Sequence, residues 1–231
     1  MKDWNLVVTI FQDGFRRALR SLRVLGSIER TPYYNVLAMK VDDPVKVLEA
    51  IELKTQESTA LYDAISKVSP ATHSFDFQST DEFLEKTKNL LVEWSPRLTG
   101  RSFHVRLHRR GPKYDLGTQQ TERSLNEALL DATARLGTSG KLSFTDPDAV
   151  ITIDTIDDRA GVALWTRDDL SRHRLLRPDY LHRKSTAWRT DHQSLANKGA
   201  TNSRLILSVG VSNPVSIVHG CKVRCRARIC A

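Results

Sequence analysis

Alternating apolar and polar positions in the first part of the chain predict strands that are separated by helices. An apolar run over residues 5–11 is typical of a buried strand, and Asp13-Gly14 directly after it marks the start of a helix. The apolar positions of this helix follow at helical spacing, at Phe15, Leu19, Leu22 and Leu25. The pattern therefore predicts a strand followed by a helix that packs on it.

A second strand and helix come next, and then a further extended segment. The strand is predicted over residues 28–41. Asp43 as a capping residue and Pro44 at the first helical position predict the start of the helix. The further extended segment is predicted over residues 64–77. Helices on one face of an antiparallel sheet, in this order, resemble a small ferredoxin-like sandwich.

Helical and strand patterns also follow one another in the second half. Ser79 and Glu82 form a capping signal for a helix, and Asp146-Pro-Asp148 predicts a turn. The predicted elements are a helix that begins at Ser79, a strand over 101–111, a helix over about 121–136, and strands at 150–153 and 161–165. This half therefore has the order α-β-α-β-β and contains no internal repeat.

The strand over residues 101–111 carries an unusual load of positive charge. Its apolar positions alternate with polar ones, so we expect one face on a core and the other in water. Between residues 97 and 113 there are six basic residues and no acidic ones: Arg97, Arg101, Arg106, Arg109, Arg110 and Lys113. Such a local excess favours a polyanionic ligand. The alternative is a strand edge that charge protects from edge-to-edge aggregation.

The net charge of the whole chain does not support the polyanion interpretation. The formal charge is +8, but residues 181–231 contain nine Lys or Arg against Asp191 alone, and residues 1–180 are balanced. All three cysteines also lie within 181–231, so the remainder of the chain has neither a disulfide framework nor a thiolate zinc site. The charge at 97–113 is thus a local excess on a neutral body.

The sequence lacks the motifs of several enzyme classes. It contains no GxxxxGK[ST] or GxGxxG element, and its histidines do not have metal-ligand spacing, so we expect no cofactor, no metal and no catalysis by this chain alone. No apolar stretch approaches the roughly 20 residues that span a bilayer, and no signal-peptide pattern is present. A soluble cytoplasmic protein without a membrane partner is expected.

The order of these elements resembles that of THUMP-domain proteins. The resemblance rests on residues 102–111, on the helical sequence 122–129, and on Asp146-Pro-Asp148 leading into 151–154. Residues 65–77 are similar to the junction that follows the N-terminal ferredoxin-like domain in such proteins. The resemblance implies an α+β protein with a ferredoxin-like domain at 1–77 and a THUMP domain at 78–180, and the tail at 181–231 lies outside it.

This family resemblance implies that the chain binds tRNA, holding the acceptor arm and its 3′ end. The family commonly fuses the module to a modifying enzyme, and no such domain follows here. The chain is most similar to the stand-alone branch, whose members are adaptors for an RNA cytidine acetyltransferase that makes N4-acetylcytidine. Residues 5–9, 164–168 and 175–179 favour that branch. Two alternatives stay open: an RNA-binding subunit of another tRNA-modifying enzyme, of the methyltransferase or thiouridine synthase type, and a protein-interaction module.

The expected RNA contacts are drawn mainly from the basic strand. Arg and Lys contacts to phosphates give affinity without reading sequence, as a module that serves many tRNAs requires. The candidate RNA-binding residues are Arg97, Arg101, His104, Arg106, His108, Arg109, Arg110, Lys113 and Lys141.

The tail over residues 181–231 loses the periodicities of the body, and the family resemblance stops near Asp179. We expect a non-homologous, largely disordered extension. A basic RNA-binding arm is the alternative, because such arms add affinity. Truncation after Tyr180 distinguishes the two.

Overall fold

The computed structural model describes residues 2–111 and 117–177 and has the predicted α+β class, with two sheets. Lys113 and the tail over 181–231 lie outside the described residues, so the predictions made for them stay predictions.

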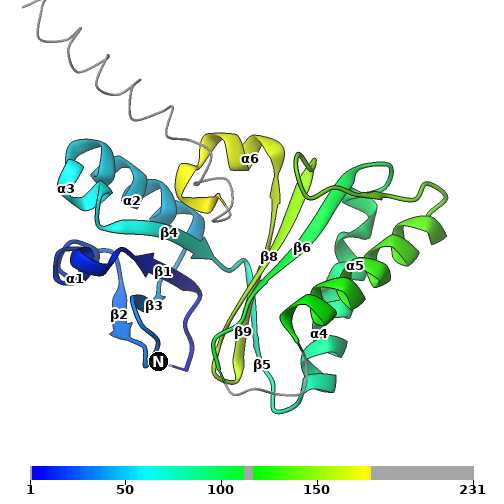
Figure 1. Cartoon of the computed structure of the whole chain (residues 1–231), viewed down its shortest axis with the longest axis horizontal. Coiled ribbons are helices and arrows are strands. Elements are labelled where there is room, and N and C mark those ends of the chain that lie inside the picture. Colours follow the sequence, from blue (N-terminus) through cyan, green and yellow to red (C-terminus); the bar gives the residue numbers. More distant parts are fainter. Residues whose placement is uncertain (1, 112–116, 178–231) are drawn as a thin grey trace, which may run out of the picture. The chain divides into compact units, whose positions relative to one another are not determined.

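The first sheet has four antiparallel strands in the order β2-β3-β1-β4 (Figure 1). Its strands are β1 (Leu6–Ile10), β2 (Ser27–Arg30), β3 (Val36–Lys40) and β4 (Ile65–Pro70). The helical elements of this part are η1 (Gln12–Gly14), α1 (Phe15–Leu22), α2 (Pro44–Glu57) and α3 (Thr59–Tyr62). The chain order β-α-β-β-α-β and this strand order are those of the predicted ferredoxin-like sandwich.

Local chemistry explains where the helices of this part begin. Asp43 Oδ1 accepts hydrogen bonds from the amides of Val45 and Lys46, which caps α2 as predicted. At Gly14, a Cβ atom would lie 2.5 Å from the Cα of Ala64, so the entry into α1 requires glycine. Apolar side chains of α1 and α2 then pack on one face of the sheet, in a core that contains Leu6, Val8, Leu22, Leu37, Leu48 and Ile51.

The segment predicted as one strand over 28–41 is a hairpin of two strands, β2 and β3. The chain reverses between them, where Asn35 adopts a φ of 57°. Asparagine tolerates this left-handed conformation, so the chain can reverse at Asn35. The apolar alternation continues on both sides of the reversal, and for that reason the periodicity predicted one strand instead of two.

The second sheet has five strands in the order β5-β9-β8-β6-β7. The strands are β5 (His73–Asp76), β6 (Ser102–His108), β7 (Lys141–Leu142), β8 (Ala149–Ile156) and β9 (Arg159–Thr166). The helical elements are α4 (Thr80–Trp94), η2 (Ser95–Arg97), α5 (Thr118–Arg135), α6 (Arg167–Arg172) and η3 (Arg174–Leu176). Strand β6 runs parallel to β7 and β8, and the other pairs are antiparallel.

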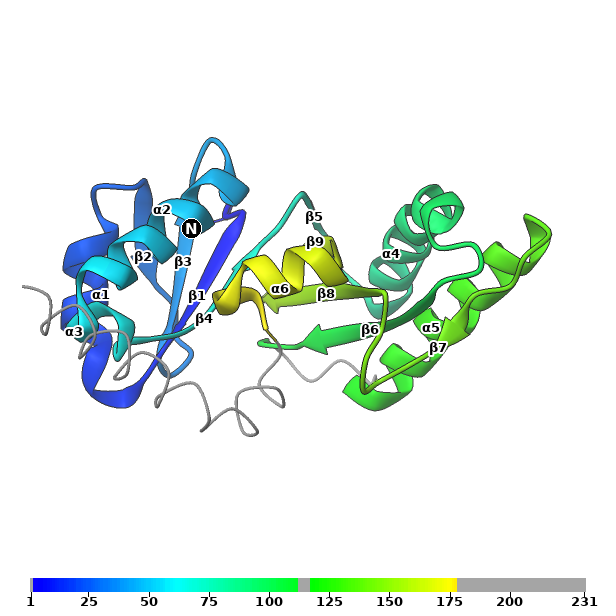
Figure 2. The ribbon, with the colours of Figure 1, turned by 90° about the horizontal axis from the view of Figure 1, so that it is seen from above.

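Helices α4 and α5 cover one face of the second sheet, as both ribbon views show (Figures 1 and 2). Their apolar side chains form a core with alternate residues of β6 and β8. This core includes Phe83 and Leu91 of α4, Leu125 and Leu129 of α5, Phe103 of β6 and Ile151 of β8. The extended segment predicted over 64–77 divides between the two sheets, because β4 pairs with β1 and β5 pairs with β9.

The chain returns to the first sheet after β9. Leu175 and Leu176 of η3 are buried in the core of the first sheet, and Glu52 of α2 accepts hydrogen bonds from the Leu175 amide and His173 Nδ1. Among the helices of residues 2–111 and 117–177, none is long and apolar enough to cross a membrane.

Candidate nucleic-acid interface

The basic strand β6 lies between β8 and the two-residue strand β7, which pairs with its first two residues. Along one side it pairs with β8 from Phe103 to His108, and on the other side Ser102 and Phe103 pair with β7. Beyond β7, helix α5 supplies the acceptors: Asn126 Oδ1 binds the Val105 amide at 2.9 Å and Glu122 Oε1 binds the Leu107 amide at 2.8 Å.

This pairing removes the physical reason for interpreting the charge as edge protection. An unprotected edge is a hazard because its backbone groups are unpaired. On the side of β6 that faces away from β8, the Arg101 and Phe103 carbonyls accept from the Lys141 and Ser143 amides, and the Val105 and Leu107 amides donate to α5 side chains. Glu122 and Asn126 are the residues that sequence reasoning missed here, and their i, i+4 spacing on a helix beside a strand is the signal that could have found them.

The prediction that the polar face of β6 lies in water is wrong at His104. This side chain is only 2% exposed, because the ring of Phe144 lies 5.4 Å away and Ser143 contributes a carbonyl oxygen 2.8 Å from Nδ1. Burial lowers the pKa of His104 below its ordinary value, although the bond to Ser143 partly opposes this. Burial thus disfavours the charged imidazole.

The C-terminal end of β6 is also turned inward. Lys67 Nζ of β4 lies 2.6 Å from Nε2 of His108, and Arg110 Nη1 lies 2.6 Å from Oδ1 of Asp154. Burial of the Asp154 carboxyl acts to raise its pKa, but the Lys67 and Arg110 cations outweigh it and hold the pKa at about 2. His108 and Arg110 thus belong to a buried ionic network, and Arg109 beside them is half-buried.

The N-terminal end of β6 presents its cations to solvent. Arg97, Arg101 and Lys141 are exposed, and the Lys141 amide donates to the Arg101 carbonyl at 2.9 Å. Arg97 and Arg101 line a hollow of about 180 Å³ whose other walls are apolar side chains and Thr166. The Arg106 side chain is 41% exposed, and its Nη1 lies 3.8 Å from Glu122. We call Arg97, Arg101, Arg106 and Lys141 the basic end.

The acidic residues close to this basic end are already paired. Asp148 accepts hydrogen bonds from the amide and hydroxyl of Ser102, and Arg167 lies 3.1 Å from it. These bonds lower the pKa of Asp148 below its ordinary value. Arg167 also lies 3.5 Å from Asp146. The Asp146-Pro-Asp148 segment is a turn, as predicted, and its paired carboxylates repel a phosphate less than free ones do.

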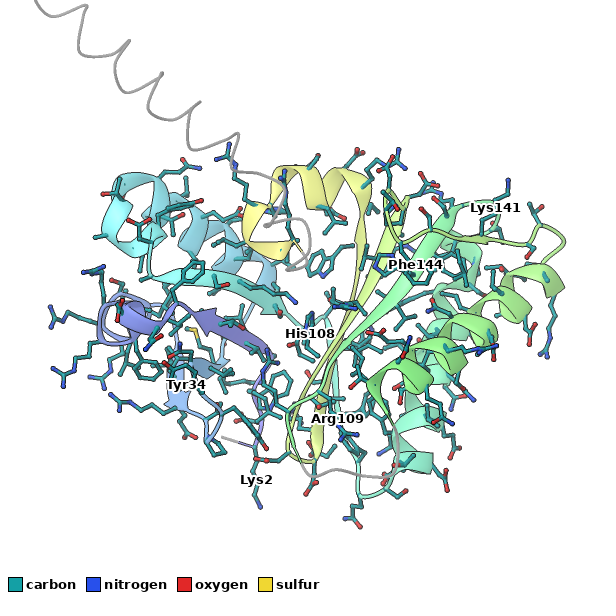
Figure 3. All side chains as sticks on the ribbon, viewed as in Figure 1. Lys2, Tyr34, His108, Arg109, Lys141 and Phe144 are labelled. Atoms are coloured by element: carbon teal, nitrogen blue, oxygen red, sulfur yellow. The ribbon has the colours of Figure 1, made fainter. Side chains whose placement is uncertain are left out.

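The cations of the linear cluster from 97 to 113 therefore have different surroundings. The seven residues of β6, a span of about 20 Å at the rise of a strand, separate Arg101 from Arg109, and Arg106 lies within that strand. Figure 3 shows Lys141 and Phe144 together, apart from His108 and Arg109. Arg97, Arg101 and Lys141 are exposed and Arg106 is half-exposed, whereas His104 is buried and His108 and Arg110 are half-buried. Binding of RNA by any of the nine candidates stays a prediction.

Comparison with known proteins identifies the second part of the chain. The THUMP domain family model matches residues 77–164. Residues 77–164 form a THUMP domain. The match extends from just after β5 to near the end of β9, so this THUMP domain contains the whole of β6 and every residue of the basic end.

One solved structure shares this fold at low sequence identity, and two others match with lower scores. PH1313 from Pyrococcus horikoshii matches with a TM-score of 0.51 at 13% identity, covering 71% of this chain and 54% of that protein. TrmN from Thermus thermophilus matches with a TM-score of 0.49 at 16% identity, covering 70% of this chain and 44% of that protein. A 4-thiouridine synthetase in complex with RNA and ATP matches with a TM-score of 0.44 at 14% identity, covering 71% of this chain and 42% of that protein. The chain thus spans about half the length of these proteins. A search of curated protein sequences found no significant match.

Proposed function

We propose that this chain binds tRNA through the basic end of its THUMP domain. THUMP domains are RNA-binding modules, and the observation that carries the proposal is that Arg97 and Arg101 line one hollow of this domain. Lys141 is exposed, and its amide donates to the Arg101 carbonyl, while Arg106 is a half-exposed cation further along β6. Arginine and lysine side chains that several elements supply form a surface for phosphates, whereas a charged helix face is usually only solvated.

The chemistry of this surface suits a nucleic acid that is recognised through its sugar-phosphate backbone. Arginine and lysine bind phosphates whatever the base, so such contacts give affinity without sequence discrimination. The hollow is lined by Arg97 and Arg101 together with apolar side chains and Thr166. A phosphate or a sugar edge fits these properties, and many tRNAs present both.

We further propose that the chain is an accessory protein and not itself a catalyst. Several histidines and acids of the described residues are engaged in structural pairs, such as His173 with Glu52 and Asp154 with Arg110. In the same residues, no three His, Cys, Asp or Glu side chains are grouped as metal ligands. The role that we propose is to present tRNA to a separate modifying enzyme.

The partner that we propose is an RNA cytidine acetyltransferase. The support is sequence resemblance in residues 5–9, 164–168 and 175–179. Among the described residues, these segments lie at strand β1, at the junction of β9 with α6 and, for residues 175–177, at η3, whose leucines are buried in the core of the first sheet. An RNA-binding subunit of another tRNA-modifying enzyme is the second candidate, because the basic end itself favours no particular modification.

The experiment measures acetylation of an unmodified tRNA transcript by a cytidine acetyltransferase with and without this chain. We expect N4-acetylcytidine only when both proteins are present, and no modified nucleoside from the chain alone. Modification by the purified chain alone would contradict the accessory role. Acetylation that the chain does not stimulate, together with intact tRNA binding, would favour another modifying partner.

A further inference from the structure

An aromatic side chain stands exposed beside the basic end. Phe144 lies between β7 and β8, and 61% of its surface is open to solvent. One side of its ring is supported by the buried imidazole of His104, with the two ring centroids 5.4 Å apart and the planes inclined by 35°. The aromatic ring is thus backed by protein on one side and open on another.

The backbone that carries Phe144 is fixed to β6. The Ser143 amide donates to the Phe103 carbonyl at 3.1 Å, and the Ser143 carbonyl lies 2.8 Å from His104 Nδ1. Two hydrogen bonds therefore hold the residue directly before Phe144. A side chain presented in this way loses less conformational freedom on binding than one on an unattached loop.

The sheet face that carries His104, the residue on which Phe144 packs, also carries cations. Lys141 pairs with Ser102 in parallel register, so its side chain lies on the same sheet face as those of Ser102, His104 and Arg106. Side chains two residues apart on a strand are about 7 Å apart, so Arg106 is the next neighbour of His104 on that face. Figure 3 shows Lys141 and Phe144 at the same end of the domain.

We propose that Phe144 is a stacking platform for an unpaired nucleotide, and that Lys141 and Arg106 bind the phosphates on either side of it. The inference rests on the proposed function, because it assumes that RNA occupies this surface. The occupant is single-stranded, since a base within a duplex already stacks on its neighbours and offers no open face to a side chain. Stacking on an aromatic ring is tolerant of sequence, like the phosphate contacts around it.

A solitary exposed phenylalanine has an ordinary explanation, since folded proteins expose many apolar side chains. Tyr34 is a suitable comparison within this chain, because it is 74% exposed but lies in the β2–β3 hairpin of the first sheet. Phe144 differs from it in having an aromatic support, His104, whose sheet face also carries Lys141 and Arg106. These two features point to a nucleotide.

The test measures binding of a single-stranded RNA oligonucleotide that contains one 2-aminopurine, and of a blunt duplex of the same sequence. We expect Phe144→Ala to weaken binding of the single strand by about tenfold to a hundredfold. It should also abolish the 2-aminopurine fluorescence change that stacking causes. Phe144→Trp should restore both signals, and Tyr34→Ala should behave as wild type. The duplex should be bound equally by Phe144→Ala and wild type.

Two further readouts distinguish a lost platform from a damaged fold or a wrong function. An abasic site in place of the stacked nucleotide should weaken wild type but not Phe144→Ala, and the salt dependence of binding should be the same in both, because a neutral ring releases no counterions. Unchanged single-strand affinity in Phe144→Ala, with wild type still binding RNA, would overturn the platform alone. Failure of wild type to bind either RNA would overturn the proposed function and this inference with it.

Discussion

The guanidinium of Arg110 and the carboxylate of Asp154 form a buried ion pair, with Nη1 and Oδ1 2.6 Å apart and side-chain exposures of 16% and 4%. Arg110 follows β6, and Asp154 lies on β8 opposite His108. Lys67 of the first sheet lies 2.6 Å from that histidine. This ionic network joins strands of both sheets, so the charges at this end of β6 stabilise the folded protein.

Replacing Asp154 with asparagine should destabilise the protein strongly at neutral pH. The change leaves Lys67 and Arg110 as buried cations without their carboxylate, and breaking a buried pair in this way typically costs about 3 to 5 kcal/mol. Urea denaturation should show this loss in the free energy of unfolding. Asp146→Asn is the matched control: its side chain is 77% exposed, so a change below about 0.5 kcal/mol is expected. Equal effects of the two substitutions would refute the structural role of the network.

Acid should remove the contribution of Asp154 to stability. The pKa of this carboxyl in the folded protein, about 2, lies below its ordinary value of 3.8, so its stabilisation is present above pH 4 and is lost as the pH falls towards 2. The shift corresponds to about 2 kcal/mol. The difference in unfolding free energy between wild type and Asp154→Asn should therefore shrink by that amount from pH 5 to pH 2. A constant difference would show that the carboxyl titrates normally.

Asn126→Leu should destabilise the protein because it leaves the Val105 amide buried without an acceptor. The expected cost is about 1 to 3 kcal/mol, and hydrogen exchange at Val105 should accelerate. Glu122→Gln keeps an acceptor for the Leu107 amide and loses only a weak pairing with Arg106, so its effect should be below about 1 kcal/mol. If Val105 stays as protected in Asn126→Leu as in wild type, α5 does not close the edge of β6.

The sequence predicts the elements of the fold better than their pairing. Strand periodicity and the cap at Asp43 locate β1, α2 and β6 because these signals are local. Local signals do not show that 64–77 changes sheets near Ala71, since both halves alternate as strands do. They also do not show that the open edge of β6 is completed by side chains of a helix.

The candidate site shows a similar limit. A run of charge indicates that cations are close together in the chain, but a strand of seven residues carries its two ends about 20 Å apart. Arg101 and Arg110 therefore have different surroundings, and the acid that engages Arg110 lies 44 residues away in sequence. No local pattern in the sequence marks Phe144 as exposed, because its exposure depends on how the β7–β8 connection lies over His104.

The most direct test of the central claim is a salt titration of tRNA binding. The variant Arg101→Gln/Arg106→Gln/Lys141→Gln removes three charges from the basic end. The matched control, Lys46→Gln/Arg123→Gln/Arg135→Gln, removes three charges from exposed positions on α2 and α5. Each lost phosphate contact should reduce the slope of log affinity against log salt by about 0.7 to 0.9.

We predict that the basic-end variant binds tRNA more weakly at every salt concentration, with a slope shallower than that of wild type by about two to three. The control variant should keep a slope close to that of wild type, because its charges lie away from the proposed contacts. A basic-end variant with the wild-type slope, or a control with the same loss, would contradict the account.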